Sequence, residues 1–111
     1  MKFTTSEVYN AAVISFKGKL MGGPDSKDFH SQIDDYLNSG KKNIIIDLSE
    51  VKFVNSSWLG NIVRAFSTVK DAGGVLKLSG NTAKIEGLLS ITKLDSIFEQ
   101  YPSVEEASKS F

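Results

Sequence analysis

The segment Asn55-Ser56-Ser57-Trp58 combines the side chains of this sequence that have the clearest chemical potential. Asparagine and serine are favoured at the first position of a helix, so a helix is expected to begin here. The first N–H groups of a helix lack acceptors within it and carry partial positive charge. A hydroxyl placed there lies beside a ready anion site, and this makes Ser56 a candidate phosphoacceptor.

Each residue of this segment also has a plain structural interpretation. Ser56 could serve only as the N-cap, worth about 1 kcal/mol of helix stability. Ser57 is either its structural neighbour or the modified hydroxyl itself. Trp58 lies at the edge of an apolar stripe that begins at Leu59, where it either packs half-buried or serves as an exposed aromatic anchor for a partner.

A protein partner would dock around this helix start and along the helix face opposite the apolar stripe. A phosphate there would cost several kcal/mol if it were buried in a fitted interface without a counter-ion, so it could switch the contact off. The candidate partner-binding residues are Asn55, Ser56, Ser57, Trp58, Asn61 and Arg64.

The rest of the sequence offers little for catalysis. It has no cysteine, and its single histidine, His30, has no companions at metal-ligand spacing. The glycine-rich run at 22–26 lacks the Gly-Lys-Ser/Thr ending of a phosphate loop. Asp34 and Asp35 are adjacent helix residues that point in different directions. We therefore expect no enzyme activity, no cofactor and no metal.

Length and composition indicate one small domain, residues 1–111, with a modest core, since 41% of the residues are hydrophobic. Thirteen basic residues balance thirteen acidic ones, which argues against binding to nucleic acid or to an anionic membrane surface. No apolar run approaches the roughly 20 residues of a membrane span, and residues 1–10 lack the apolar centre of a secretion signal. A cytoplasmic protein is the simplest expectation.

Alternation and helical spacing predict the elements that position the candidate site. Strands are expected at residues 3–8, 11–17, 43–48, 75–78 and 96–101. Helices are expected from Pro24 to Ser39-Gly40, from the Asn55 segment to Ala72-Gly73-Gly74, over residues 82–92, and after Pro102 with Ser103 and Glu106 as a capping box.

The resulting order, β-β-α-β-α-β-α-β-α, indicates an α/β fold with a mixed, mostly parallel sheet of four to five strands and about four helices. The first two strands are expected to pair antiparallel. Three consecutive isoleucines at 44–46 predict a central strand that is covered on both faces.

At this point the sequence resembles a family. A hydrophobic strand that ends in Asp47-Leu48-Ser49, followed by a short loop and by Ser-Ser-x-Leu-Gly at a helix start, is similar to the STAS domain of bacterial anti-sigma factor antagonists. The resemblance covers nearly the whole chain. It includes Gly18-Lys19-Leu20, Gly73-Gly74 before the VLKL strand, and residues 94–98 (LDSIF).

The resemblance implies that the unphosphorylated domain binds an anti-sigma factor with Ser/Thr kinase activity and so frees a sigma factor. Ser56 occupies the position of the serine that is phosphorylated in the family. The kinase would inactivate the domain by phosphorylating Ser56, and a PP2C-type phosphatase would restore the active form by removing the phosphate. The family motif is Asp-Ser-Ser/Thr-Gly-Leu-Gly, so Asn55 and Trp58 stand where Asp and Gly are usual. Met21 likewise stands where an acidic residue is frequent.

These departures favour an alternative, a STAS scaffold or accessory module of a signalling or transport complex that never becomes phosphorylated. A second alternative is a small enzyme or nucleotide-binding domain. The oligomeric state is expected to be a monomer or a weak homodimer that pairs through the outer strand.

Overall fold

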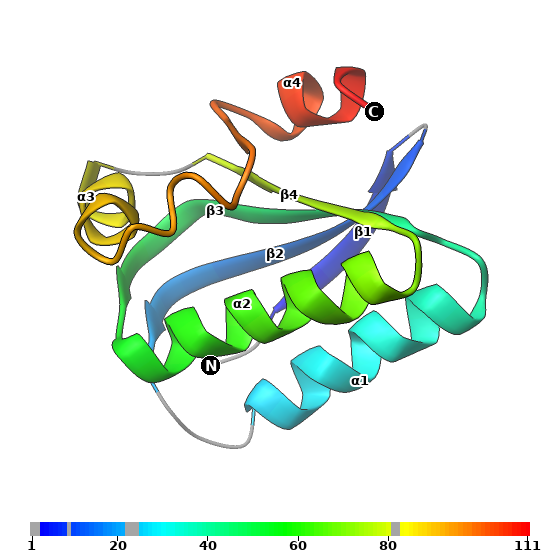
Figure 1. Cartoon of the computed structure of the whole chain (residues 1–111), viewed down its shortest axis with the longest axis horizontal. Helices are drawn as coiled ribbons and strands as arrows, with labels where there is room; N and C mark the ends of the chain where they lie inside the picture. The colour runs from blue at the N-terminus through cyan, green and yellow to red at the C-terminus, as the bar shows by residue number, and fades with distance from the viewer. Residues whose placement is uncertain (1–2, 9, 22–24, 81–82) are drawn as a thin grey trace.

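The computed structural model describes residues 3–8, 10–21, 25–80 and 83–111, apart from the side chains of Asp25 and Lys84. The predicted turns at Tyr9 and at 22–24, and the predicted helix start at Thr82, lie partly or wholly outside these residues. The elements are β1 (Thr4–Val8), β2 (Ala11–Leu20), α1 (Asp25–Asn38), β3 (Asn43–Val54), α2 (Ser56–Asp71), β4 (Val75–Ser79), α3 (Ala83–Ile91), β5 (Gln100–Tyr101) and α4 (Val104–Lys109) (Figure 1). This is the predicted order.

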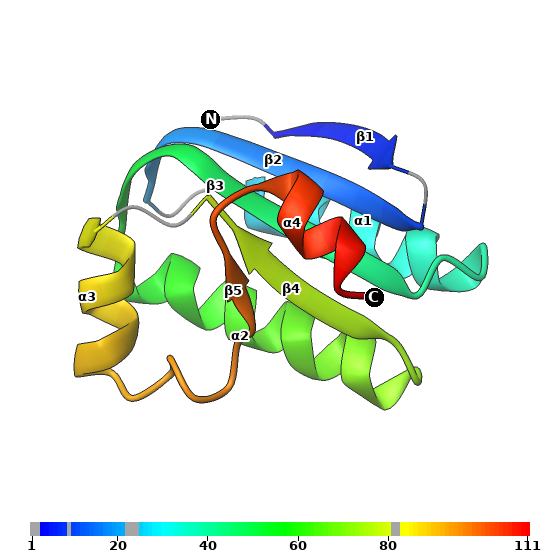
Figure 2. The same ribbon diagram turned by 90° about the horizontal axis from the view of Figure 1, so that it is seen from above.

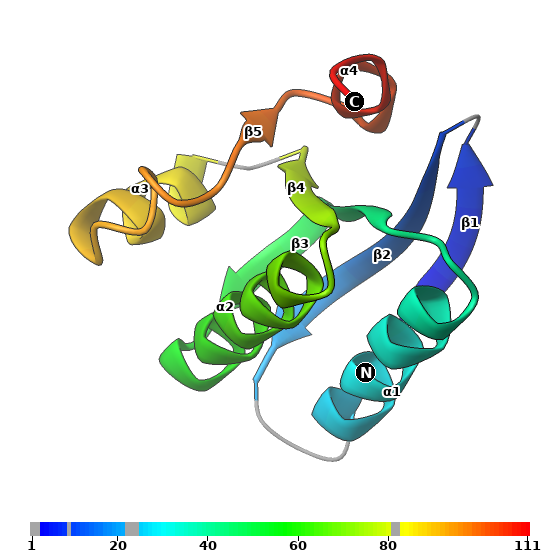
Figure 3. The same cartoon turned by 45° about the vertical axis from the view of Figure 1, so that its right-hand side comes forward.

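The described strands form one five-stranded sheet in the order β1-β2-β3-β4-β5. β1 pairs antiparallel with β2, and all the other pairs are parallel. α1 and α2 connect parallel neighbours and lie side by side on one face of the sheet, whereas α4 lies on the other (Figure 3). The predicted α/β class and the mixed, mostly parallel sheet are therefore confirmed.

The three isoleucines of β3 divide between two hydrophobic clusters. Ile44 and Ile46 belong to the main core beneath α1 and α2, while Ile45 packs on the opposite face with Val13 and Ala107. All three are fully buried. The prediction of a central strand covered on both faces is confirmed, because alternate side chains of β3 pack into apolar clusters on opposite faces of the sheet.

The third strand runs six residues beyond its predicted end. It continues to Val54 because two register shifts against β2, between Ser15 and Lys17 and between Gly18 and Lys19, each place one extra residue in β3. Leu48, Val51 and Val54 are buried at a spacing of three residues. A bulged strand breaks the alternation of two, so the sequence pattern of this segment resembles that of a loop.

The last predicted strand, residues 96–101, was too long. Only Gln100–Tyr101 pairs with β4, and the preceding residues form a turn in which the N–H groups of Ile97 and Phe98 donate to the carbonyl of Leu94. Phe98 is buried, and its ring lies 5.3 Å from that of Phe66 on α2. The apolar residues that suggested a strand therefore close the core from a turn.

The outer face of the sheet is covered by α4, as the view from above shows (Figure 2). The N-cap of α4 is Ser103, whose Oγ accepts from the Glu106 N–H at 3.2 Å, which is one half of the predicted capping box. Lys77 of β4 is buried beneath the end of the chain. Its Nζ donates to the Ser110 carbonyl at 3.1 Å and lies 4.5 Å from the centre of the Phe111 ring.

Candidate functional site

The start of α2 is fixed by Asn55. Its backbone N–H donates to the Leu20 carbonyl at 3.0 Å, which holds the end of β3 against the end of β2. Its side-chain Oδ1 accepts from the Trp58 N–H at 2.9 Å, and its carbonyl accepts from the Leu59 N–H at 3.0 Å. Its extended backbone, φ −84° and ψ 172°, is typical of an N-cap.

Asn55, and not Ser56, is therefore the N-cap, and the interpretation of Ser56 as a plain cap is wrong. Both serines that follow are exposed, and neither hydroxyl forms a hydrogen bond with any residue that the structure describes. The acidic residues Asp and Glu are absent from the first turn of α2. The result is an exposed hydroxyl at a positively polarised helix start, with no carboxylate on that turn.

The hydrogen bond between the Asn55 side chain and the Trp58 N–H should contribute measurably to the stability of the fold. We expect Asn55→Ala to lower the free energy of unfolding by about 0.5–2 kcal/mol, because the Trp58 N–H loses its acceptor. Asn55→Asp restores an acceptor and adds a charge that the helix dipole favours, so it should retain the stability of the wild type. Urea denaturation followed by circular dichroism measures both. Equal stability of wild type and Asn55→Ala would contradict the assignment of the cap.

Trp58 is buried, with 1% of its surface accessible. Its ring centre lies 5.3 Å from that of Phe16 on β2 and 5.8 Å from that of Phe29 on α1. The interpretation of Trp58 as an exposed aromatic anchor is contradicted. Trp58 packs in the core, as the other interpretation proposed, and it is fully buried where half-burial was expected. Its contribution to the helix start is therefore to fix α2 between the sheet and α1.

The other candidate residues extend along α2. Asn61 is half-buried, and its Oδ1 lies 3.3 Å from Nε2 of His30 on α1, a contact that joins the two helices. Arg64 is exposed, and its carbonyl accepts a hydrogen bond from the Thr68 hydroxyl. Ser57, Asn61 and Arg64 thus follow one face of the helix, with Asn61 partly committed to a structural contact.

Three exposed apolar residues near the helix start were not among the candidate site residues. Met21, just after β2, is 53% exposed, and Phe53, two residues before Asn55, is 44% exposed. Ile91 at the end of α3 is 82% exposed. Residues 49–54, predicted as a loop, contain three apolar residues, of which Phe53 is exposed while Val51 and Val54 are buried, so the sequence alone could not single out Phe53.

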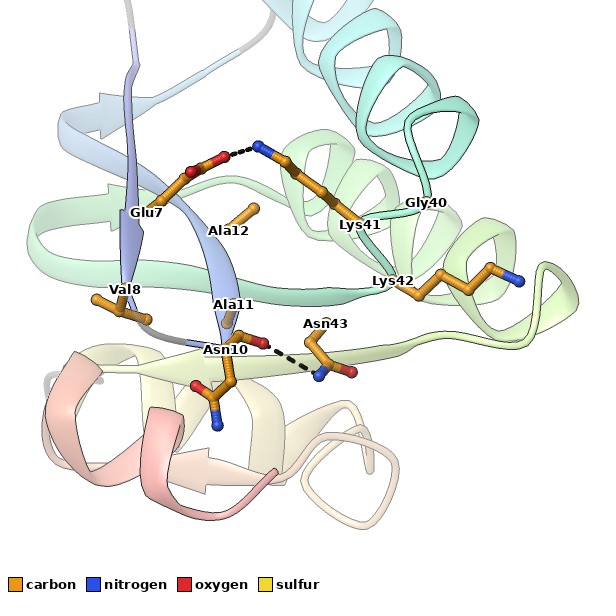
Figure 4. A pocket seen from close by; sticks show the side chains of 9 residues that line it. All are labelled: Glu7, Val8, Asn10, Ala11, Ala12, Gly40, Lys41, Lys42 and Asn43. Carbon is orange, nitrogen blue, oxygen red and sulfur yellow. Dashed lines mark hydrogen bonds and ion pairs between the residues drawn. The ribbon is translucent and has the colours of Figure 1, made fainter.

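The opposite end of the sheet holds a cavity of about 300 Å³ at the starts of β2 and β3 (Figure 4). An ion pair between Glu7 and Lys41 crosses its border, and Asn43 Nδ2 donates to the Asn10 carbonyl at 3.1 Å. The ion pair ties β1 to the residues just before β3, and the hydrogen bond ties the start of β3 to the turn just before β2. Since β3 separates this end from Ser56, the cavity has no part in the candidate site.

The described part of the chain contains neither a group of metal-binding side chains nor a helix suited to span a membrane. No three His, Cys, Asp or Glu side chains there are grouped so that they could hold a metal ion. No helix among those residues is long and apolar enough to cross a membrane.

Known proteins share both the sequence pattern and the fold. A family model, the STAS domain, matches residues 2–107. A Thermotoga neapolitana protein named as a candidate anti-sigma factor antagonist is 38% identical over 74 residues, which are 67% of this chain and 66% of that protein. The match thus spans just under two thirds of the relative's length.

Solved structures extend the comparison. The crystal structure of a candidate anti-sigma factor antagonist from Thermotoga maritima superposes with a TM-score of 0.83 at 28% identity, over 97% of this chain and 92% of that one. The phosphorylated form of the Bacillus cell fate determinant SpoIIAA gives a TM-score of 0.77 at 18% identity, over 97% of each chain, a likeness of fold alone. With its sheet, its helix start and the family model in agreement, the chain belongs to the STAS domain family.

Proposed function

We propose that this chain is an anti-sigma factor antagonist that binds an anti-sigma factor with Ser/Thr kinase activity through the start of α2, and that phosphorylation of Ser56 switches this binding off. The observation that carries the proposal is that Ser56 is exposed while Asn55 performs the capping. The Ser56 hydroxyl is therefore not needed to cap the helix. Related proteins named as candidate anti-sigma factor antagonists support the choice of partner.

The chemistry proposed for Ser56 is a phosphoryl transfer. Its Oγ attacks the γ-phosphorus of ATP bound to the kinase, the bond to ADP breaks, and the hydroxyl proton passes to a base of the kinase. The phosphate at the first position of α2 would be stabilised by the helix dipole, so the fold should persist. A PP2C-type phosphatase would restore the hydroxyl by hydrolysis.

Burial of Trp58 supports the proposal as well. A bulky residue two positions after the acceptor would obstruct a narrow kinase cleft if it projected outward. Its indole is directed into the core, against Phe16 and Phe29, and 1% of its surface is accessible. Trp58 therefore adds very little to the surface presented around Ser56.

The direct test is to incubate the chain with ATP and each purified GHKL-type serine kinase of its source organism, and to map modified peptides by mass spectrometry. We expect one phosphoryl group on Ser56, none on the Ser56→Ala variant, and full modification of the Ser57→Ala variant. Binding of such a kinase without modification of any serine would instead support the unphosphorylated scaffold. Modification of Ser57 in place of Ser56 would move the switch by one residue.

A further inference from the structure

β1 forms one edge of the sheet, and no described strand lies beyond it (Figure 2). The strand at the other edge, β5, has only two residues, which leaves little backbone for a further strand to pair with. β1 has five residues, contains neither lysine nor proline, and runs against β2 without a shift of register. Lysine, proline, bulges and shortness are the usual means by which proteins block an edge, so β1 is open to pairing.

The backbone groups that face this edge follow from the hairpin. Val8 and Ala11 are register partners separated by two residues of sequence, so they exchange both backbone hydrogen bonds. Hydrogen-bonded pairs alternate along an antiparallel ladder, which makes Ser6 the next residue of β1 that is bonded to β2. The N–H and C=O groups of Thr5 and Glu7 therefore point away from β2, toward the free edge.

The side chains of β1 leave room for a neighbouring strand. Thr4, Thr5, Ser6 and Glu7 are all exposed. Glu7 is the only charged residue of the strand, and its ion pair with Lys41 offsets its charge. β1 thus offers free main-chain groups flanked mainly by small hydroxyl side chains, a combination suited to the addition of a further strand.

Of the registers that an antiparallel partner of the same sequence could adopt, three join outward-facing residues to outward-facing residues. Pairing centred on Thr5 or on Glu7 aligns only three residues of β1, and the latter also sets two Glu7 carboxylates opposite each other. Pairing centred on Ser6 aligns all five residues and places each Glu7 opposite a threonine. Because like charges directly opposite are unfavourable, the strand is complementary to itself in this one register.

We infer that this edge binds a second copy of the chain, whose β1 pairs antiparallel with β1 of the first copy about a twofold axis at Ser6. The contact is isologous, with the same residues on both sides. Thr5 of each copy exchanges hydrogen bonds with Glu7 of the other, and the two five-stranded sheets become continuous. A ladder of five residues buries little surface, so the dimer is weak and depends on concentration.

Disulfide crosslinking tests this register. The chain has no cysteine, so Ser6→Cys carries a single thiol. The two residues at the axis form a non-hydrogen-bonded pair with Cα atoms about 4.5 Å apart, which is within the reach of a disulfide. We expect mild oxidation to convert most of the Ser6→Cys chain into a disulfide-linked dimer, measured by non-reducing electrophoresis. Circular dichroism checks that the variant is folded.

Two further single-cysteine variants are matched controls. Thr4→Cys lies on the same strand, but the two copies of this residue would be about 13 Å or more apart along the ladder, too far for a disulfide. Ser57→Cys is exposed on α2, away from the edge. Both should crosslink at least about fivefold less than Ser6→Cys. Crosslinking of Ser6→Cys no faster than that of either control would overturn the inference.

Charge at Thr5 tests the same pairing without a covalent bond. Thr5 lies opposite Glu7 of the second copy, so Thr5→Lys should lower the Kd of the dimer and Thr5→Glu should raise it, each by about threefold or more. Thr4 lies opposite Val8, so Thr4→Lys and Thr4→Glu should differ by less than about twofold. Sedimentation equilibrium measures these constants. A monomer at every concentration, or equal Kd values for Thr5→Lys and Thr5→Glu, would overturn the inference.

Discussion

Replacement of Trp58 by alanine is expected to lower the free energy of unfolding by about 3–5 kcal/mol, the range found for removal of a large buried aromatic side chain. Trp58 is 1% exposed and packs edge-on against Phe16 and at a tilt against Phe29, and the two phenylalanine rings also contact each other. Its removal leaves a cavity where three elements meet, and the surrounding strands and helices can close it only in part. Urea denaturation measures this loss of unfolding free energy, with helix content followed by circular dichroism at 222 nm. A difference of about 1 kcal/mol is readily resolved in this way.

Two variants control this experiment. Ser57→Ala changes the exposed neighbour of Trp58 and should alter the stability by no more than about 0.5 kcal/mol. Trp58→Phe keeps an aromatic ring in the cluster and should recover part of the loss. A Trp58→Ala variant as stable as the wild type would show that the indole does not occupy the core, and the account of the helix start would then be wrong.

Replacement of Ser56 by aspartate is expected to weaken binding of the anti-sigma factor by about 100-fold or more, which corresponds to roughly 3 kcal/mol. The carboxylate brings a charge into an interface that is neutral at this position, and it is left without a counter-ion when the partner docks. The fold should tolerate it, because an acidic residue in the first turn of a helix is favoured by the helix dipole.

Calorimetric titration of the kinase identified by phosphorylation measures this change. Ser56→Ala should bind like the wild type, since it adds no charge. Ser57→Asp tests position, because the same charge one residue further along α2 should weaken binding less. Wild-type affinity in Ser56→Asp would exclude an electrostatic switch at this serine, whatever the result of the phosphorylation experiment.

The order of the elements could be predicted from the sequence because each signal was local. The isoleucine run of β3 and the helical spacing of apolar residues in α1 and α2 are patterns within single segments. Gly40 illustrates the same point: the first helix was predicted to end at Ser39-Gly40, and Gly40 has the left-handed φ of +82° that glycine adopts freely after a helix. Local chemistry of this kind does not depend on what the element packs against.

The bulges of β3, the burial of Trp58 and the choice of the cap depend on partners that are distant in the sequence. The bulges of β3 arise in its pairing with β2, so nothing in residues 49–54 alone reveals them. Trp58 is buried by rings from β2 and α1, whereas its position in α2 placed it only at the edge of the apolar stripe. Asn55 and Ser56 are almost equally good caps, and the hydrogen bond from Asn55 N–H to Leu20 decides between them.

The same arrangement supplies a built-in optical reporter. The chain has one tryptophan, and its indole lies in a dry aromatic cluster two residues after Ser56. Its fluorescence should therefore be emitted at short wavelength in the native state and respond when charge or a bound protein perturbs the first turn of α2. Occupancy of the helix start can thus be followed in real time with the unlabelled, unmodified chain.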